Sequence, residues 1–272
     1  MDFITKLTRA IRLNNSLLCV GLDTTPERVP EGVDIFEFNK AIIDATSDIV
    51  CAYKPNLAFY EAMGVEGMTI LEKTVSYIPK SIPIIGDAKR GDIGNTAKAY
   101  ARALFMYFNF DAVTVNPYLG VDSLDPFLEY NDKGIFILCR TSNAGAADFQ
   151  SLRCVTDEGT KPLFQIVAQK ASRWNKSGNI GLVVGATYPE ELRSIRDEHP
   201  EMLLLIPGIG AQGGDLKLVL RYSLNTNYEG IIINSSRGII YASKESDFAK
   251  AARLAAQDLR DRINMYRTAD TP

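Results

Sequence analysis

The sequence predicts a single-domain (β/α)8 TIM barrel that spans residues 1–272. Two observations support this fold class: eight short apolar, β-branched runs are typical of buried parallel strands, and segments of helical length separate most of them. Eight such units over roughly 250 residues are the layout of a closed barrel. A doubly wound open sheet is the alternative, but it usually has fewer strands. It also tends to begin with a G-x-G-x-x-G turn, which residues 21–26 do not match.

Each expected strand is a short, mainly apolar run, and several runs end on a polar or charged residue. The third run, residues 82–85, leads directly into the charged stretch 86–96. In chain order the strands are expected at residues 17–23, 48–56, 82–85, 112–117, 134–140, 179–186, 203–210 and 230–236.

The segments between the strands have the length or the apolar spacing of helices. Phe3, Leu7 and Ile11 recur at helical spacing, which predicts a leading amphipathic helix over residues 1–15. Further helices are expected over residues 34–48, 64–78, 96–105, 161–174 and 188–198, with a final helix near 245–266.

Charge and hydropathy exclude several classes of protein. The net charge of −3 argues against nucleic acid as a partner, because binding a phosphate backbone needs a basic surface. No apolar run approaches the length of a membrane span, so we expect no membrane association. The first residues lack the basic-then-apolar layout of a signal peptide. We therefore expect a cytoplasmic protein.

The cysteine and histidine content limits the available chemistry. Cys19, Cys51 and Cys139 fall inside apolar runs, Cys154 does not, and no C-x-x-C spacing occurs, so we expect free thiols and no zinc site. The chain has one histidine, His199, in a polar stretch. One histidine excludes multi-histidine metal sites and disfavours a histidine-based triad. Any proton chemistry would therefore fall to lysines and carboxylates.

The stretch after the third expected strand carries a D-x-K-x-x-D pattern. Asp87 and Lys89 lie two residues apart, so in an extended chain their side chains leave the strand on the same side. Gly91 and Gly94 permit a tight turn, and Asp92 lies between them. Two carboxylates at this spacing can keep a lysine charged while a substrate is bound. A solvated salt bridge at a strand end is the alternative.

Polar residues gather at the C-terminal ends of the expected strands. In a barrel of this type the active site lies at that end. Scattered surface charge would not fall so regularly on strand ends, so one shared active site is favoured. The strand-end positions are Asp23, Lys54, Asp87, Lys89, Asn116, Ser142, residues 208–210 and residues 234–237.

The ends of the seventh and eighth strands have the composition of a phosphate site. The glycine-rich turn 207–214 can bring backbone N–H groups close to an anion, and Gln212 could add a side-chain donor. Arg237, within 234–238, supplies a guanidinium that can bind phosphate through two parallel hydrogen bonds. Two ordinary glycine turns beside a surface arginine are the alternative. We expect a phosphorylated small molecule.

The stretch Asp87-Ala88-Lys89-Arg90-Gly91-Asp92-Ile93 resembles the signature of the orotidine 5′-monophosphate decarboxylases, in their longer bacterial branch. The D-x-K-x-x-D pattern alone is shared by relatives that act on sugar phosphates. Ala144 stands where related sequences often have proline, which bears on the stiffness of its loop. The resemblance spans all eight strands, and the D-x-K-x-x-D pattern together with the other matching positions is more selective than the pattern alone. Those other positions are Asp23, Lys54, Thr141-Ser142-Asn143, residues 208–212 and Arg237.

The resemblance implies loss of CO₂ from C6 of orotidine monophosphate to give uridine monophosphate. This reaction is the last step of de novo pyrimidine nucleotide synthesis and would use no metal and no organic cofactor. Lys89 would be the cation that stabilises charge at C6 and the acid that protonates it. Asp87 and Asp92 would keep Lys89 charged and oriented, and Lys54 would complete an alternating Lys-Asp-Lys-Asp network.

The resemblance also implies a homodimer in which Asp92 and Thr96 reach into the neighbouring subunit's site. The other implied contacts with the nucleotide are Asp23 and Lys54 to the ribose hydroxyls, Ser142 to the pyrimidine, and Gln212, Arg237, Gly210 and Gly238 to the phosphate.

Two other functions compete with this prediction. A metal-dependent sugar-phosphate lyase, such as a keto-gulonate phosphate decarboxylase, would need an additional carboxylate for Mg²⁺ near the strand ends. A catalytically silent phosphate-binding barrel would need only the phosphate site, so the presence of both lysines and both aspartates argues against it. Residues 143–157 are small and polar, which fits either a closing lid or an inert surface loop.

Overall fold

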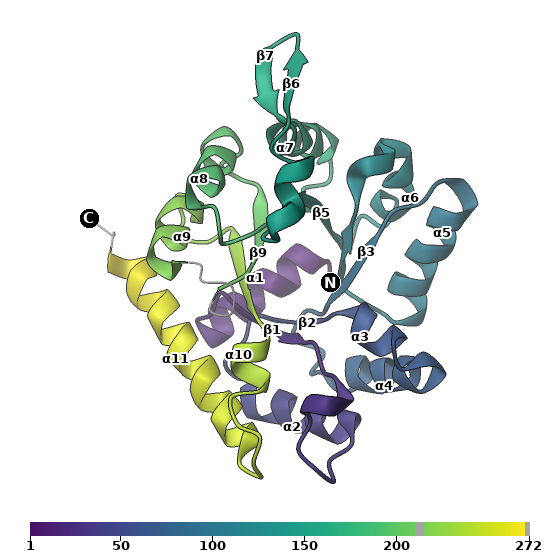
Figure 1. Ribbon diagram of the computed structural model, residues 1–272, viewed down its shortest axis with the longest axis vertical. Coiled ribbons are helices and arrows are strands. Elements are labelled where there is room, and N and C mark those ends of the chain that lie inside the picture. Colours follow the sequence, from purple (N-terminus) through teal and green to yellow (C-terminus); the bar gives the residue numbers. More distant parts are fainter. Residues whose placement is uncertain (210–214, 270–272) are drawn as a thin grey trace.

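The computed structural model describes residues 1–209 and 215–269. Its strands form one parallel eight-stranded sheet that curls into a nearly closed barrel, with helices around the outside (Figure 1). The strand order is β2-β1-β10-β9-β8-β5-β4-β3. Two isolated parallel bridges, Tyr53 with Ile84 and Asn56 with Asp87, join β2 to β3 across the remaining gap. The predicted single-domain (β/α)8 barrel is confirmed as the fold class.

Seven of the eight barrel strands lie inside the predicted runs, and β3 is the exception. It begins at Ile85 and continues through the charged stretch to Arg90, so the predicted strand over 82–85 is placed too early. Parallel pairing with β4, interrupted by a register shift between Gly86 and Arg90, keeps this polar segment in the sheet. The barrel strands are β1 Leu18–Leu22, β2 Ala52–Pro55, β3 Ile85–Arg90, β4 Ala112–Val115, β5 Gly134–Arg140, β8 Ile180–Val184, β9 Leu203–Pro207 and β10 Ile231–Ser235.

The expected helices are present, and four shorter ones join them. The helix expected from residue 96 begins two residues earlier, at Gly94, and continues as a short π-helix over Ala103–Tyr107. The helices are α1 Phe3–Asn14, α2 Ile35–Thr46, α3 Leu57–Glu61, α4 Gly64–Tyr77, α5 Gly94–Arg102, α6 Asp125–Leu128, α7 Leu163–Trp174, α8 Pro189–Glu198, α9 Leu216–Ser223, α10 Arg237–Ile240 and α11 Phe248–Ala269. No helix in the described ranges is both long and apolar enough to span a bilayer.

The N-terminal helix α1 packs at the N-terminal ends of the strands, opposite the predicted site. The Asp2 side chain caps α1 by accepting a hydrogen bond from the Thr5 backbone N–H. The Phe3 ring meets the Phe136 ring edge-on, with centroids 5.8 Å apart. A Cβ at Gly134, the first residue of β5, would lie 2.3 Å from that Phe3 ring, so only glycine allows this approach.

A buried arginine holds the same end of the barrel together. Arg196 of α8 donates to the backbone carbonyls of Ser223, Met202 and Gly230 at 2.7, 2.7 and 2.9 Å. The last two residues directly precede β9 and β10, so one guanidinium ties two strand starts to the end of α9.

A β-hairpin replaces part of the segment expected to be a lid or loop. Strands β6 Arg153–Thr156 and β7 Gly159–Pro162 pair antiparallel and project from the barrel (Figure 1). Thr156 pairs with Gly159, so the two residues 157–158 form the turn. Gly159 itself has φ +109°, a conformation that glycine adopts readily. The helix expected from residue 161 therefore begins at Leu163.

Candidate active site

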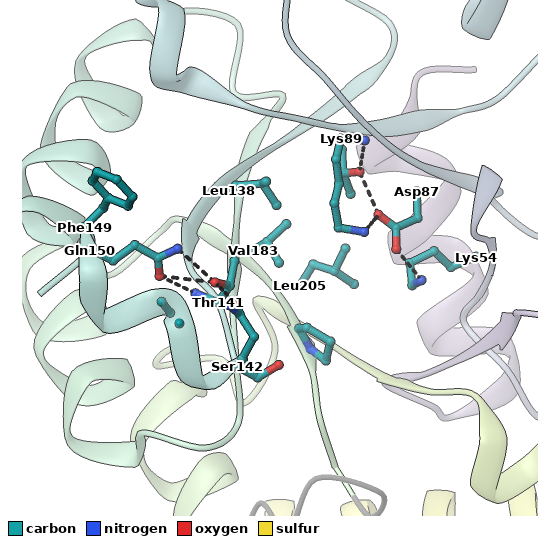
Figure 2. A pocket seen from close by; sticks show the side chains of 15 residues that line it. Lys54, Asp87, Lys89, Leu138, Thr141, Ser142, Phe149, Gln150, Val183 and Leu205 are labelled. Atoms are coloured by element: carbon teal, nitrogen blue, oxygen red, sulfur yellow. Dashed lines mark hydrogen bonds and ion pairs between the residues drawn. The ribbon is translucent and has the colours of Figure 1, made fainter. Parts of the chain in front are cut away.

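Two lysines and an aspartate meet at the C-terminal ends of β2 and β3. Lys54 Nζ lies 2.9 Å from Asp87 Oδ2, and Lys89 Nζ lies 2.6 Å from Asp87 Oδ1 (Figure 2). The Lys54 side chain is 5% exposed and the Lys89 side chain 47% exposed. One carboxylate therefore holds a buried ammonium with one oxygen and a solvent-accessible ammonium with the other.

A threonine that sequence reasoning missed completes this cluster. The Thr114 hydroxyl donates to Asp87 Oδ1 at 2.9 Å and accepts the Lys89 backbone N–H at 2.9 Å. Lys89 has φ +47°, which costs a residue with a side chain about 1 kcal/mol. The hydrogen bond to Thr114 offsets part of that cost. The available signal was a single hydroxyl in the otherwise apolar β4 run.

The cluster strongly favours its charged form. Burial works against the Lys54 charge, but the carboxylates of Asp87 and Asp23 outweigh it and raise the pKa of Lys54 above its ordinary value. Burial also works against the Asp87 charge, yet Lys54 and Lys89 hold the pKa of Asp87 well below its usual range. At neutral pH the interior therefore contains a fixed carboxylate between two ammonium groups.

The cluster forms one side of a cavity of about 480 Å³, a volume suited to a small organic ligand. In Figure 2 the charged residues lie on one side, apolar side chains of β5, β8 and β9 lie between, and polar residues after β5 lie opposite. The apolar part comprises Leu138, Val183, Leu205 and Pro207, and the polar side comprises Thr141, Ser142, Asn143 and Gln150.

The predicted pyrimidine contact, Ser142, lines this cavity. It lies two residues beyond β5, and its backbone packs against Gly185 at the end of β8. A Cβ at Gly185 would lie 2.7 Å from the Ser142 Cβ, so glycine is required for this close approach. No hydrogen bond of the Ser142 hydroxyl is found among residues 1–209 and 215–269, which leaves it free to contact a ligand.

Of the predicted ribose and phosphate residues, Lys54 lines this cavity, whereas Asp23, Arg237 and Gly238 lie at the same end of the barrel without lining it. Asp23 follows β1, and its buried Oδ1 has no hydrogen-bond partner within the described residues. Arg237 begins α10 two residues beyond the end of β10, and both Arg237 and Gly238 are exposed. Gly210 and Gln212 lie outside the described residues.

Asp92 and Thr96 do not join the cluster within this chain. Asp92 Oδ1 accepts the backbone N–H of Ile93 at 2.8 Å. Thr96 is exposed on the first turn of α5. Of the expected alternating network, the structure thus brings together Lys54, Asp87 and Lys89.

The described residues contain no group of three or more histidine, cysteine or acidic side chains arranged to hold a metal ion. All four cysteines are free thiols, and Cys19, Cys51 and Cys139 are buried, as predicted.

Comparison with known proteins places the chain in a well-populated group. Residues 16–252 match the model of the orotidine 5′-phosphate decarboxylase / HUMPS family. An orotidine 5′-phosphate decarboxylase of Dehalococcoides mccartyi (strain CBDB1) is 55% identical over 267 residues, covering 98% of this chain and 99% of the relative. The enzyme of that name from Ralstonia nicotianae is 50% identical over 276 residues, covering 98% and 100%. The solved structure of Leishmania donovani OMP decarboxylase superposes with a TM-score of 0.86 at 41% identity, covering 99% and 100%.

Proposed function

The chain belongs to the orotidine 5′-phosphate decarboxylase / HUMPS family, and from this membership and the site geometry we propose that it converts orotidine 5′-monophosphate to uridine 5′-monophosphate. The observation that carries the proposal is the Lys54–Asp87–Lys89 cluster on one side of a nucleotide-sized cavity. The reaction is a carboxy-lyase step in pyrimidine nucleotide synthesis.

The chemistry requires stabilisation of negative charge at C6 of the pyrimidine. The bond between C6 and the carboxylate breaks, CO₂ leaves, and the electron pair stays on C6 until it takes a proton. A fixed cation in a site that excludes water stabilises such charge. At an effective dielectric near 20, two unit charges 4 Å apart interact by about 4 kcal/mol, enough to fix their protonation states.

Lys89 is the residue placed to do both tasks. Its ammonium is held at 2.6 Å from Asp87 Oδ1, yet its side chain is 47% exposed toward the cavity and solvent. It can therefore donate a proton to C6 and regain one from water. Lys54, which is 5% exposed, is too enclosed for that exchange and instead holds Asp87 in place. In this scheme no metal and no organic cofactor takes part.

The remaining substrate contacts are assigned to the cavity and to the strand ends beside it. Ser142 faces the cavity opposite the lysines, which suits a contact with the pyrimidine. Asp23 Oδ1 has no hydrogen-bond partner in the part of the chain that the structure describes, so Asp23, with Lys54, suits the ribose hydroxyls. The exposed Arg237 begins a helix at the end of β10, which suits the phosphate, together with Gly238, Gly210 and Gln212.

The functional unit in this proposal is a homodimer in which Asp92 and Thr96 complete the neighbouring site. Two observations support it. Lys89 has one carboxylate partner within the described residues, and apolar side chains are exposed in the segments that follow β3 and β4. Ile93 and Tyr118 are 57% and 81% exposed. A second subunit placed there would cover both and bring its own Asp92 toward Lys89.

Subunit complementation tests the shared site. Lys89→Ala and Asp92→Ala chains should each be inactive alone. Mixed dimers, formed by unfolding and refolding the two together, would contain one intact site, so the mixture should regain about a quarter of wild-type activity. No recovery from a mixture that does form dimers would show that Asp92 serves its own chain.

The reaction itself is tested by following the ultraviolet absorbance of orotidine monophosphate with the purified protein, with and without EDTA. We expect rapid loss of the substrate spectrum at the same rate in both. Loss of activity with EDTA would favour a metal-dependent sugar-phosphate lyase. No turnover combined with uridine monophosphate binding would favour a nucleotide-binding scaffold.

A cytoplasmic location stays a prediction. The free thiols of Cys19, Cys51, Cys139 and Cys154 support it, because such thiols are typical of a reducing compartment.

A further inference from the structure

The turn that carries Ser142 is held by a side chain from outside the turn. Gln150 lies beyond the short 3₁₀ helix Ala144–Asp148, and its side chain reaches back to Thr141 (Figure 2). Gln150 Oε1 accepts the Thr141 backbone N–H at 2.8 Å, and Gln150 Nε2 lies 2.9 Å from Thr141 Oγ1. One amide thus binds both the backbone and the side chain of the residue before Ser142.

The proton count fixes the direction of these bonds. The Thr141 hydroxyl has one proton, and its shortest acceptor contact is Asn143 Oδ1 at 2.6 Å. With that proton committed, Thr141 Oγ1 must accept from Gln150 Nε2. The chain of bonds therefore runs from Gln150 through Thr141 to Asn143, across Ser142.

Gln150 is itself anchored from several elements. Its backbone carbonyl accepts the Phe164 N–H at 3.0 Å from α7, and its N–H donates to Ala146 at 2.9 Å. Its Oε1 also accepts from Arg140 Nη1 at 3.5 Å. The Arg140 side chain is 3% exposed, pairs with Glu191 of α8 and stacks on the Tyr188 ring. Gln150 is thus fixed through its backbone by α7 and through its side chain by Arg140 of β5, which α8 holds in turn.

On its opposite side the turn packs tightly against the end of β8. Ser142 packs against Gly185 so closely that a Cβ there would lie 2.7 Å from the Ser142 Cβ. Gln150 and Gly185 therefore confine the turn from two sides. The Ser142 hydroxyl, without a partner of its own among the described residues, is left pointing to the cavity side.

We propose that Gln150 is a positioning residue for the pyrimidine end of the substrate, acting on Ser142 through Thr141. This inference rests on the proposed function and deepens it. It assigns to Gln150 a role in holding the base and none in holding the phosphate. Displacement of a catalytic contact by an ångström can lower a rate about 100-fold, so a side chain that touches no reacting atom can still control turnover.

The test compares two ligands that differ in the base. We replace Gln150 by Leu, which has a similar volume and removes every hydrogen bond of the side chain. We then measure orotidine monophosphate kinetics and inhibition by uridine monophosphate and by ribose 5-phosphate. We expect kcat/KM to fall about 10- to 100-fold, because two or three hydrogen bonds near the base are lost. Uridine monophosphate binding should weaken at least 5-fold, while ribose 5-phosphate binding should change less than 2-fold.

Gln165→Leu is the matched control. Gln165 is a half-buried glutamine of α7 whose Nε2 donates to Ser194 Oγ at 2.5 Å, away from the cavity. This variant should keep wild-type kinetics. Gln150→Glu retains an acceptor for the Thr141 N–H and should recover part of the activity lost in Gln150→Leu.

A second variant tests the role of Gln150 if Gln150→Leu folds poorly. Thr141→Val removes the hydroxyl that links Gln150 to Asn143. It should likewise weaken uridine monophosphate binding more than ribose 5-phosphate binding. Equal weakening of both ligands, or no change in either, would overturn the role of Gln150. Absence of turnover by the wild-type chain would instead overturn the proposed function, and the comparison of the two ligands would still decide the role of Gln150.

Discussion

Two buried cations lie at opposite ends of the barrel and are stabilised in different ways. Lys54, at the C-terminal ends of the strands, faces the carboxylate of Asp87 at 2.9 Å. Arg196, beside the N-terminal ends of β9 and β10, has no carboxylate within ion-pair distance in residues 1–209 and 215–269. It is surrounded by the backbone carbonyls of Ser223, His199, Pro200, Met202 and Gly230.

The pKa values of the two cations move in opposite directions from their ordinary values. Burial lowers the pKa of Arg196 to about 10, and the opposing charge of Glu201 does not outweigh it. The carboxylates around Lys54 outweigh the same burial effect and raise its pKa. All three guanidinium nitrogens of Arg196 donate to backbone carbonyls, so Arg196 serves the fold. The cluster around Lys54 keeps one ammonium, that of Lys89, half exposed and available for chemistry.

The largest expected effect is the loss of turnover on replacing Lys89. Lys89→Ala should lower kcat about 10⁴-fold or more, because the cation beside C6 and the proton donor are lost together. Uridine monophosphate should still bind within a few-fold of wild type, and the exposed Lys250→Ala on α11 serves as the control. Substantial residual turnover in Lys89→Ala, measured by substrate absorbance, would contradict the role given to this residue.

The next effect tests the structural end of the barrel. Arg196→Met should lower the free energy of unfolding by about 3–5 kcal/mol, because it leaves several buried carbonyls without donors. The kcat of the folded fraction should stay close to wild type. Urea denaturation followed by tryptophan fluorescence measures the change.

Arg193 provides the matched control on the same helix. Its side chain is 57% exposed and pairs with Asp197 at 3.6 Å, so Arg193→Met should cost less than about 1 kcal/mol. If Arg196→Met were no more destabilising than Arg193→Met, the carbonyl contacts would not be what holds this end together.

The smallest expected effect is the pH dependence of stability at the active-site end. The pKa of Asp87 is depressed in the folded state, so its stabilising contribution is complete above the unfolded pKa near 3.9 and declines as pH falls toward the folded pKa. The stability difference between wild type and Asp87→Asn should therefore be constant above about pH 5 and shrink below about pH 4. Urea titrations across pH 3–7 measure it; a pH-independent difference would mean that the carboxylate charge contributes nothing.

Most of the barrel was predictable from the sequence because its signals are local. Apolar, β-branched runs such as residues 134–140 identify strands wherever the chain later places them, and β5 has those bounds. The D-x-K spacing placed Asp87 and Lys89 on one side of an extended segment, and the structure pairs them at 2.6 Å. The prediction that β3 ends before Asp87 was wrong, because pairing with β4 can keep polar residues in a strand.

By itself, then, the sequence determined the fold class, the end of the barrel that carries polar residues, and the family. Only the tertiary structure decided which groups meet: Thr114 on Asp87, Gln150 on Thr141, Gly185 against Ser142, and Arg196 among carbonyls. The physical reason is separation along the chain. Periodicity and turn chemistry act over a few residues, whereas Asp87 and Thr114 are 27 residues apart and meet only because neighbouring parallel strands set their register.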